Sequence, residues 1–104
     1  MTDWIDVCEV RDIDHEDVMR FDAGGPTYAI YRATDGSFYA TDGMCTHEGM
    51  HLSEGLVMDD TIECPKHNGR FNFRTGAATR TPACINLRCH AERVVDGWVQ
   101  LAVG

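Results

Sequence analysis

Two mixed pairs of cysteine and histidine constrain this 104-residue chain more than any other feature of its sequence. The first pair is Cys45 and His47, and the second pair, Cys64 and His67, follows after sixteen intervening residues. Thiolate sulfur and neutral imidazole nitrogen are both good ligands for transition metals. The spacing therefore predicts that two loops of the chain converge on one metal centre.

The order of the residue types within each pair distinguishes between the candidate metals. A zinc finger usually takes both cysteines from one turn and both histidines from another. Here each loop supplies one cysteine and one histidine. That arrangement suits a two-iron cluster in which both cysteines bind one iron and both histidines bind the other. The pattern favours iron, with a structural zinc site as the alternative.

Glycine and proline residues flank the pairs in a way that suits a cluster. Gly49 and Gly69 would let backbone N–H groups approach the cluster sulfurs closely, because glycine has no side chain to interfere. Pro65 biases Cys64 toward an extended backbone.

The two segments that carry these residues have a recognisable pattern. CTHEGMHL (45–52) and CPKHNGRF (64–71) resemble the two cluster-binding loops of Rieske [2Fe-2S] proteins. The resemblance implies one [2Fe-2S] cluster per chain. Its implied ligands are Cys45, His47, Cys64 and His67.

The loops differ from those of respiratory and photosynthetic Rieske proteins. Those proteins have one further cysteine in each loop, joined in a disulfide, but the corresponding residues here are Met50 and Lys66. They also have a serine and a tyrosine that donate hydroxyl hydrogen bonds to sulfur, at positions occupied here by Gly69 and Phe71. Such hydrogen bonds stabilise the reduced cluster, so their loss lowers the potential. We expect a potential near the low end of the range of roughly −150 to +300 mV for Rieske centres.

The remainder of the chain predicts an all-β fold. Short runs rich in Val, Ile, Tyr and Phe alternate with turn signals, and Asp-Gly pairs at 35–36 and 96–97 predict two hairpins. We expect strands at residues 4–8, 18–22, 27–32, 37–41, 61–63, 70–72, 85–88, 91–95 and 98–103, and a short helical turn at 14–17. The resemblance implies a Rieske fold, which is an antiparallel β-sandwich base with an inserted small cluster-binding subdomain. We place that subdomain at about 43–80 within a single Rieske domain over residues 1–104.

Length and charge narrow the possible functions. A chain of 104 residues is too short for a substrate domain in addition to a Rieske domain, so we expect an electron carrier and not an enzyme. A net charge of −8 disfavours nucleic acid and anionic membranes as partners. The N-terminal region lacks a signal-peptide pattern, and no stretch reaches the roughly 18 apolar residues of a membrane span. We therefore expect a cytoplasmic protein with no membrane attachment.

Several residues outside the ligand set have predicted roles. Three cysteines are predicted to be small buried hydrophobic residues, and three histidines are predicted to lie on the surface. These are Cys8, Cys84 and Cys89, and His15, His51 and His90. Asn68 stands where many Rieske proteins have glycine, and it tolerates a left-handed backbone better than other non-glycine residues.

Other residues lie close to the ligands in sequence. Pro82 resembles the proline of a third loop that covers the cluster in Rieske proteins. Glu48, Lys66 and Arg70 either contact a partner or adjust the electric field at the cluster, or they simply face water. The sequence leaves these interpretations open.

The resemblance implies a Rieske-type ferredoxin of a multicomponent bacterial oxygenase system, such as a ring-hydroxylating or demethylating system. Such a ferredoxin takes one electron from an NAD(P)H-dependent ferredoxin reductase and delivers it to a terminal Rieske oxygenase by transient docking. We expect a monomer. The alternatives are a Rieske-like small subunit permanently attached to a larger redox enzyme, and a zinc-binding structural or interaction module.

Overall fold

The computed structural model describes residues 3–46, 49–65, 68–81, 83 and 85–103. Within these residues the chain forms β-strands, arranged in three antiparallel sheets, and two short 3-10 helices. The all-β fold class predicted from the sequence is confirmed.

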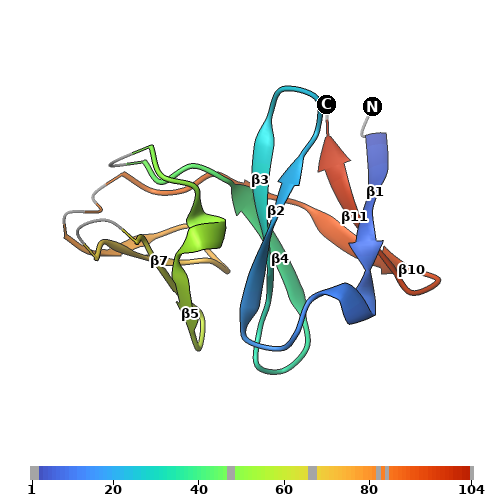
Figure 1. Ribbon diagram of the computed structural model, residues 1–104, viewed down its shortest axis with the longest axis horizontal. Coiled ribbons are helices and arrows are strands. Elements are labelled where there is room, and N and C mark those ends of the chain that lie inside the picture. Colours follow the sequence, from blue (N-terminus) through green and yellow to red (C-terminus); the bar gives the residue numbers. More distant parts are fainter. Residues whose placement is uncertain (1–2, 47–48, 66–67, 82, 84, 104) are drawn as a thin grey trace.

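Two of the sheets form the base of the molecule, which lies to the right in Figure 1. The first sheet has the order β1–β11–β10, and its strands are β1 (Asp3–Glu9), β11 (Trp98–Val103) and β10 (Glu92–Val95). The second has the order β2–β3–β4–β9, and its strands are β2 (Asp17–Asp22), β3 (Thr27–Arg32), β4 (Phe38–Asp42) and β9 (Cys89–His90). Both ends of the chain therefore contribute to the base.

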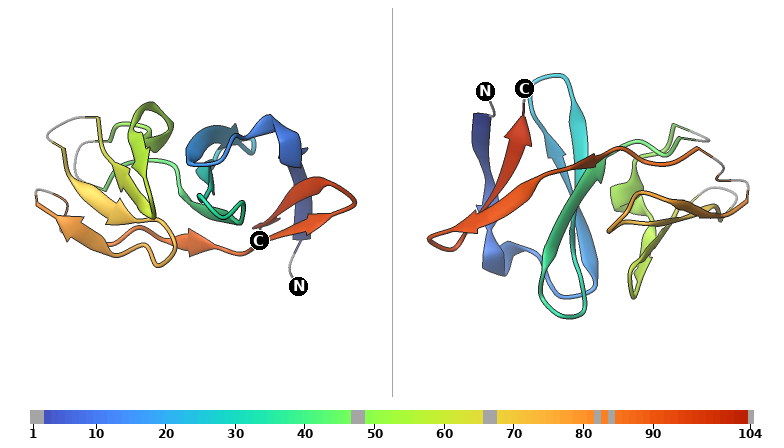
Figure 2. Two further views of the ribbon diagram at one scale, coloured as in Figure 1. Left: turned by 90° about the horizontal axis from the view of Figure 1, so that it is seen from below. Right: turned by 180° about the vertical axis from the view of Figure 1, so that it is seen from behind.

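The third sheet consists entirely of residues that lie between β4 and β9 in the sequence. Its strands, in order, are β5 (Leu56–Met58), β6 (Thr61–Glu63), β7 (Arg70–Asn72) and β8 (Ala78–Arg80). This sheet lies beside the base, as Figure 1 and both views in Figure 2 show. It is the inserted unit that the sequence predicts, and the subdomain limits of about 43 and 80 stay a prediction.

Strand β3 is buried on both faces and separates two hydrophobic cores. Ala29 and Tyr31 point into the core beneath the third sheet, and Tyr28 and Ile30 point into the core between the two base sheets. Successive side chains of a strand face opposite sides, so this alternation follows from the period of two. The nearly continuous apolar run of β3 is what a strand buried on both faces requires.

Both Asp-Gly hairpins are present. Asp96 and Gly97 have φ angles of 51° and 80° and connect β10 to β11. Two consecutive left-handed residues are typical of a type I′ turn, whose twist matches that of the flanking strands. Gly36, with φ of 88°, lies in the turn that connects β3 to β4. Both predicted hairpins are confirmed.

The prediction of a strand at residues 85–88 is wrong. The chain forms only the two-residue strand β9, at Cys89–His90, on the edge of the second base sheet. Main-chain groups of residues 85–88 bond to several different segments, and Arg88 O accepts from the Asp42 N–H of β4 at 2.9 Å. The Leu87 N–H donates to Gly76 O at 2.7 Å, and Ile85 O accepts from the Thr46 hydroxyl at 2.8 Å. This segment follows the third sheet as a loop because its hydrogen bonds do not form a ladder.

The helical turn expected at 14–17 is also misplaced. A 3-10 helix, η1, lies earlier, at Val10–Asp12, and the Glu9 N–H donates to its Asp12 carboxylate at 2.9 Å. The sequence did not predict a second 3-10 helix, η2 (Leu52–Glu54), or the three-residue strands β5 and β8. No helix in the described part of the chain has the length and hydropathy needed to cross a membrane.

Truncating a leucine in the base core should destabilise the protein strongly. Leu101 is 0% exposed and lies between Ile5 of β1 and Glu92 of β10. We expect Leu101→Ala to lower the free energy of unfolding by about 2–5 kcal/mol, because it leaves a cavity in a packed core. Leu56, which is 56% exposed, is the matched control, and Leu56→Ala should cost less than about 0.5 kcal/mol. Urea denaturation followed by circular dichroism measures both, and equal costs would contradict the described core.

Candidate metal centre

The first predicted ligand loop is a small hairpin that projects from the end of β4. Met44 and His51 form an antiparallel bridge across its base. Inside this bridge the Cys45 N–H donates to Met50 O at 2.7 Å, and outside it the Leu52 N–H donates to Gly43 O at 2.7 Å. These bonds fix the position of the Cys45 backbone just after the end of β4.

The second loop, between β6 and β7, repeats the backbone arrangement of the first. The Cys64 N–H donates to Gly69 O at 2.7 Å, so in both loops the cysteine N–H reaches the carbonyl five residues later. The residue four positions after each cysteine is left-handed, with φ of 66° at Gly49 and 58° at Asn68. The tolerance of Asn68 for this conformation was predicted from the sequence and is confirmed.

Both cysteines are buried in the same hydrophobic core. Cys45 is 3% exposed and Cys64 is 1% exposed, and both belong to the cluster that contains Leu52, Phe71 and Ala83. Two thiol groups that enter one apolar core from two matching loops are suited to binding one iron atom. The described part of the site therefore fits the cysteine half of a [2Fe-2S] cluster.

The two histidines of the predicted ligand set, His47 and His67, lie outside the described residues, as do Glu48, Lys66, Pro82 and Cys84. Among the residues that are described, no group of three or more Cys, His, Asp or Glu side chains is placed to hold a metal ion. The histidine half of the ligand set therefore stays a prediction.

A third loop, which follows β8, packs against both ligand loops. A Cβ atom added to Gly69 would lie 3.0 Å from the Ala83 Cβ, which shows how closely this loop approaches the second ligand loop. Thr46 of the first ligand loop donates its hydroxyl hydrogen to Ile85 O at 2.8 Å. The described residues of this loop thus contact both ligand loops.

Two positions that carry sulfur-directed hydroxyls in respiratory Rieske proteins carry none here. Phe71 is 0% exposed in the core with Cys45 and Cys64, and Gly69 is buried at the end of the second loop. This arrangement is consistent with the low potential expected from the sequence.

The prediction that His51 is a surface residue is wrong. Its side chain is buried, with 3% exposure, and both ring nitrogens are within hydrogen-bond distance of a partner, Thr27 or Ser53. His90 is also largely covered, because its Nε2 lies 2.6 Å from Asp42 Oδ1 and its ring packs edge-on against Tyr28. His15 is exposed as predicted.

The cysteines outside the ligand set differ in their environments. Cys8 is buried as predicted, and burial, with a smaller contribution from Asp12, raises the pKa of its thiol to about 11. Such a thiol is packed as a small hydrophobic side chain and is unreactive near neutral pH. Cys89 is exposed, contrary to the prediction, because the short strand β9 lies at a sheet edge.

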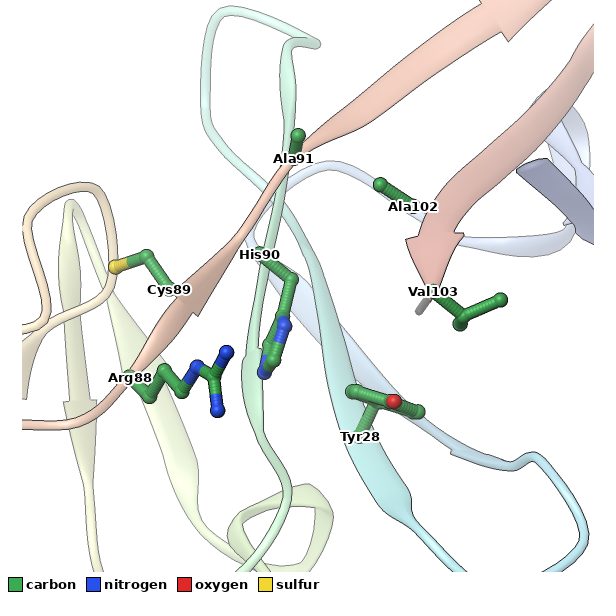
Figure 3. A pocket seen from close by; sticks show the side chains of 7 residues that line it. All are labelled: Tyr28, Arg88, Cys89, His90, Ala91, Ala102 and Val103. Carbon is green, nitrogen blue, oxygen red and sulfur yellow. The ribbon is translucent and has the colours of Figure 1, made fainter. Parts of the chain in front are cut away.

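A cavity of about 350 Å³ lies in the base, away from the ligand loops. Figure 3 shows Arg88 and His90 on one side of β9 and Cys89 on the other. The remaining lining residues are Tyr28, Ala91, Ala102 and Val103. Because none of them belongs to a ligand loop, this cavity is not part of the predicted metal centre.

Polar and apolar side chains adjoin the ligand loops. Arg70 Nε donates to Glu63 Oε2 at 2.7 Å across β6 and β7, so Arg70 forms an ion pair within the chain and does not simply face water. The exposed Met44 and Ile85 flank the first ligand loop and the third loop.

Comparison with known proteins identifies the family. Residues 3–91 match the Rieske [2Fe-2S] domain. The chain belongs to the Rieske family. Membership of this family decides against the zinc-binding module and implies an iron–sulfur cluster.

The relatives of this Rieske chain include ferredoxins of oxygenase systems. It is 38% identical over 100 residues to Ferredoxin CarAc of Metapseudomonas resinovorans, covering 95% of this chain and 92% of that protein. It is 36% identical over 98 residues to the ferredoxin component of the naphthalene 1,2-dioxygenase/salicylate 5-hydroxylase systems of a Ralstonia species, covering 94% and 93%. These similarities confirm the interpretation as an electron-carrying ferredoxin, not a catalytic enzyme.

Solved structures agree on the fold. A chain in the complex of reduced oxygenase and oxidized ferredoxin of carbazole 1,9a-dioxygenase matches with a TM-score of 0.90 and 37% identity, covering 95% of this chain and 92% of that one. A Mycobacterium tuberculosis chain described as an NADH-dependent nitrite reductase small subunit matches with a TM-score of 0.88 but only 21% identity, covering 100% and 97%. The Rieske fold is therefore confirmed, and it is shared by both kinds of protein.

Replacing Asn68 should reveal the conformational demand of the second ligand loop. At φ of 58° a β-branched residue is strained by about 1–2 kcal/mol, whereas glycine is not. We expect Asn68→Val to lower the thermal midpoint and the amount of bound iron, and Asn68→Gly to preserve both. Thermal denaturation and iron analysis measure these quantities. Equal iron content in all three proteins would contradict the role assigned to this backbone conformation.

Proposed function

We propose that this chain is the ferredoxin component of a multicomponent oxygenase system. It receives one electron from an NAD(P)H-dependent reductase and passes it to a terminal Rieske oxygenase. The observation that carries this proposal is the similarity to ferredoxin components along nearly the whole of both chains. The two matching loops, with Cys45 and Cys64 in one core, support this proposal because such a carrier would bind its cluster there.

The proposed ligands divide the site into an inner and an outer half. Cys45 and Cys64 would hold the inner iron, because their side chains lie within the hydrophobic core. His47 and His67 would hold the outer iron. One [2Fe-2S] cluster per chain, when bound, would supply a single reversible one-electron step.

The surface beside the two loops suits brief contact with a redox partner. Met44 is 40% exposed and Ile85 is 62% exposed, while the residues at the left-handed positions, Gly49 and Asn68, are also exposed. Small and apolar side chains let a partner approach the loops closely without a network of ion pairs that would slow its release. Transient docking, a monomeric state and a cytoplasmic location belong to the same proposal.

The alternative within redox proteins is a small subunit attached permanently to one large enzyme. The likeness to the described nitrite reductase subunit is one of fold alone, at 21% identity. The ferredoxin components share 36–38% of their residues with this chain, which favours the carrier.

Reconstitution with the components of a related system tests the carrier proposal. We expect the purified chain, mixed with NADH, the reductase and the terminal oxygenase of the carbazole system, to restore substrate oxidation that is absent without it. Cys64→Ser, which removes one proposed ligand, should abolish this activity, and Cys89→Ser, at an exposed cysteine outside the site, should retain it.

Two controls allow the reconstitution to distinguish an electron carrier from an attached subunit. Iron and acid-labile sulfide analysis of the anaerobically purified chain should give two of each per chain, as a [2Fe-2S] cluster requires. Purification from its native host should give the chain separate from large enzymes. The chain could instead copurify with one large enzyme at a constant ratio and fail to support the oxygenase. That result would contradict the carrier proposal and support a permanently attached subunit.

Introducing a hydroxyl beside the cysteines should raise the reduction potential. We expect Phe71→Tyr to have a higher potential, because a hydrogen bond to a ligand sulfur stabilises the reduced cluster, and about 59 mV corresponds to a tenfold shift in a one-electron equilibrium. Phe38→Tyr is the matched control, since Phe38 is buried in the base core, which contains neither ligand cysteine. Voltammetry measures both variants, and equal potentials would contradict the tuning argument.

A further inference from the structure

The side chain of His51 joins the first ligand loop to the base of the molecule. His51 closes the loop through its bridge to Met44 and caps the start of η2. Its side chain is 3% exposed, and a polar ring buried to this degree needs hydrogen-bond partners within the protein. The role of this buried polar ring is not explained by cluster ligation.

Both ring nitrogens of His51 have partners that fix its protonation. The Ser53 backbone N–H, which can only donate, lies 3.1 Å from Nδ1. Nδ1 therefore accepts, and the single proton of the neutral ring is on Nε2. Nε2 lies 2.8 Å from the Thr27 hydroxyl oxygen and donates to it. The ring thus bridges η2 and the first residue of β3.

The backbone around the ring reinforces this connection. The Gly43 N–H donates to Thr27 O at 2.9 Å, beside the side-chain bond from His51. A Cβ atom at Gly43 would lie 2.5 Å from His51 Nε2 and 3.0 Å from the backbone of β3. The imidazole therefore fills the space between the loop and the strand, and only glycine at position 43 leaves room for it.

The Thr27 hydroxyl also interacts with Asp22 of β2, which forms an ion pair with Arg20. A hydrogen bond from Thr27 is the largest cause that lowers the pKa of the Asp22 carboxyl, and Arg20 contributes as well. Arg20 Nε lies 3.1 Å from Asp22 Oδ2. With its proton donated to Asp22, the Thr27 hydroxyl is left to accept from His51. The same tautomer of His51 is thus favoured from both sides.

We propose that His51 is a positioning residue for the metal centre, which holds the Cys45 loop at the base through its neutral Nε2–H ring and Thr27. The inference rests on the proposed cluster site. Cys45 is next to Met44, the bridge partner of His51, and its N–H bonds to Met50 O, next to His51 on the other strand of the loop. A shift of His51 therefore displaces both sides of the loop that carries Cys45.

Protonation of the His51 ring should weaken the hydrogen bonds that connect the first ligand loop to the base. A proton on Nδ1 would face the Ser53 N–H, so two donors would meet where a hydrogen bond now exists. The charged groups that face the ring are Arg20 and Asp22 of β2 and Glu54 of η2. Burial, followed by the charge of Arg20, lowers the pKa of His51 from its ordinary 6.5, and this outweighs the raising effects of the two carboxylates. The stabilisation is complete above about pH 6.5 and is lost as pH falls toward the lower folded pKa.

Two pairs of variants of the 104-residue chain with its cluster bound test the proposal. Thr27→Val removes the hydroxyl and keeps the side-chain shape, and Thr27→Ser keeps the hydroxyl. His51→Asn retains an acceptor for the Ser53 N–H but cannot titrate, and His15→Gln is the matched change at an exposed histidine. Visible absorption follows cluster loss at several pH values, and electron paramagnetic resonance of the reduced protein reports the geometry of the centre.

We expect Thr27→Val to lose its cluster about tenfold faster than wild type at pH 7, a factor that corresponds to about 1.4 kcal/mol. Thr27→Ser should be close to wild type. In wild type and His15→Gln the rate of loss should rise as pH falls below about 6.5, and in His51→Asn this rise should be much smaller. The paramagnetic signal should shift or broaden in Thr27→Val and not in Thr27→Ser.

Other outcomes would overturn either the positioning role of His51 or the proposed function. Equal rates for Thr27→Val and Thr27→Ser, or an undiminished acid response in His51→Asn, would overturn the positioning role while leaving the cluster site intact. If His51→Asn does not fold, the comparison of Thr27→Val with Thr27→Ser still tests the positioning role. A wild-type protein that shows no Rieske absorption or paramagnetic signal after reconstitution with iron and sulfide would instead overturn the proposed function.

Discussion

Strand β3 is buried on both of its faces, and each face forms part of one hydrophobic core. Tyr28 and Ile30 pack into the base, and Ala29 and Tyr31 pack beneath the third sheet, so one strand serves two cores. The aromatic side chain of Tyr31 stacks on Phe73 with ring centroids 4.7 Å apart, which ties the inserted sheet to the base. Cys45 and Cys64 lie in the same core as Ala29 and Tyr31, so β3 connects the proposed metal centre to the base.

The two ligand loops show how different sequences can produce matching backbones. Their histidines stand two and three residues after the cysteine, yet both loops close with a hydrogen bond from the cysteine N–H to the fifth residue. Each loop needs a left-handed residue at the fourth position, which glycine supplies in one and asparagine in the other. The result is a symmetric pair of buried thiols, supported by the third loop.

Local patterns in the sequence predicted much of this arrangement. The Asp-Gly turns, the alternating strands and the conformation of Asn68 could be predicted because neighbouring residues determine them. The burial of His51 and the position of β9 could not. His51 depends on Thr27, 24 residues away. Residues 85–88 make single bonds to Thr46, Gly76 and Asp42 and do not form a ladder with one strand. Such choices are set by contacts that the sequence alone does not reveal.

In the proposed centre, each loop contributes one cysteine and one histidine to a two-iron cluster. Electron–nuclear double resonance of the reduced protein, prepared with ¹⁵N-labelled histidine, tests it most directly. We expect strong coupling of the unpaired electron to two histidine nitrogens, and to one nitrogen when either His47 or His67 is replaced. Two strong couplings that persist after those replacements, or no strong coupling in the wild-type protein, would contradict the ligand assignment.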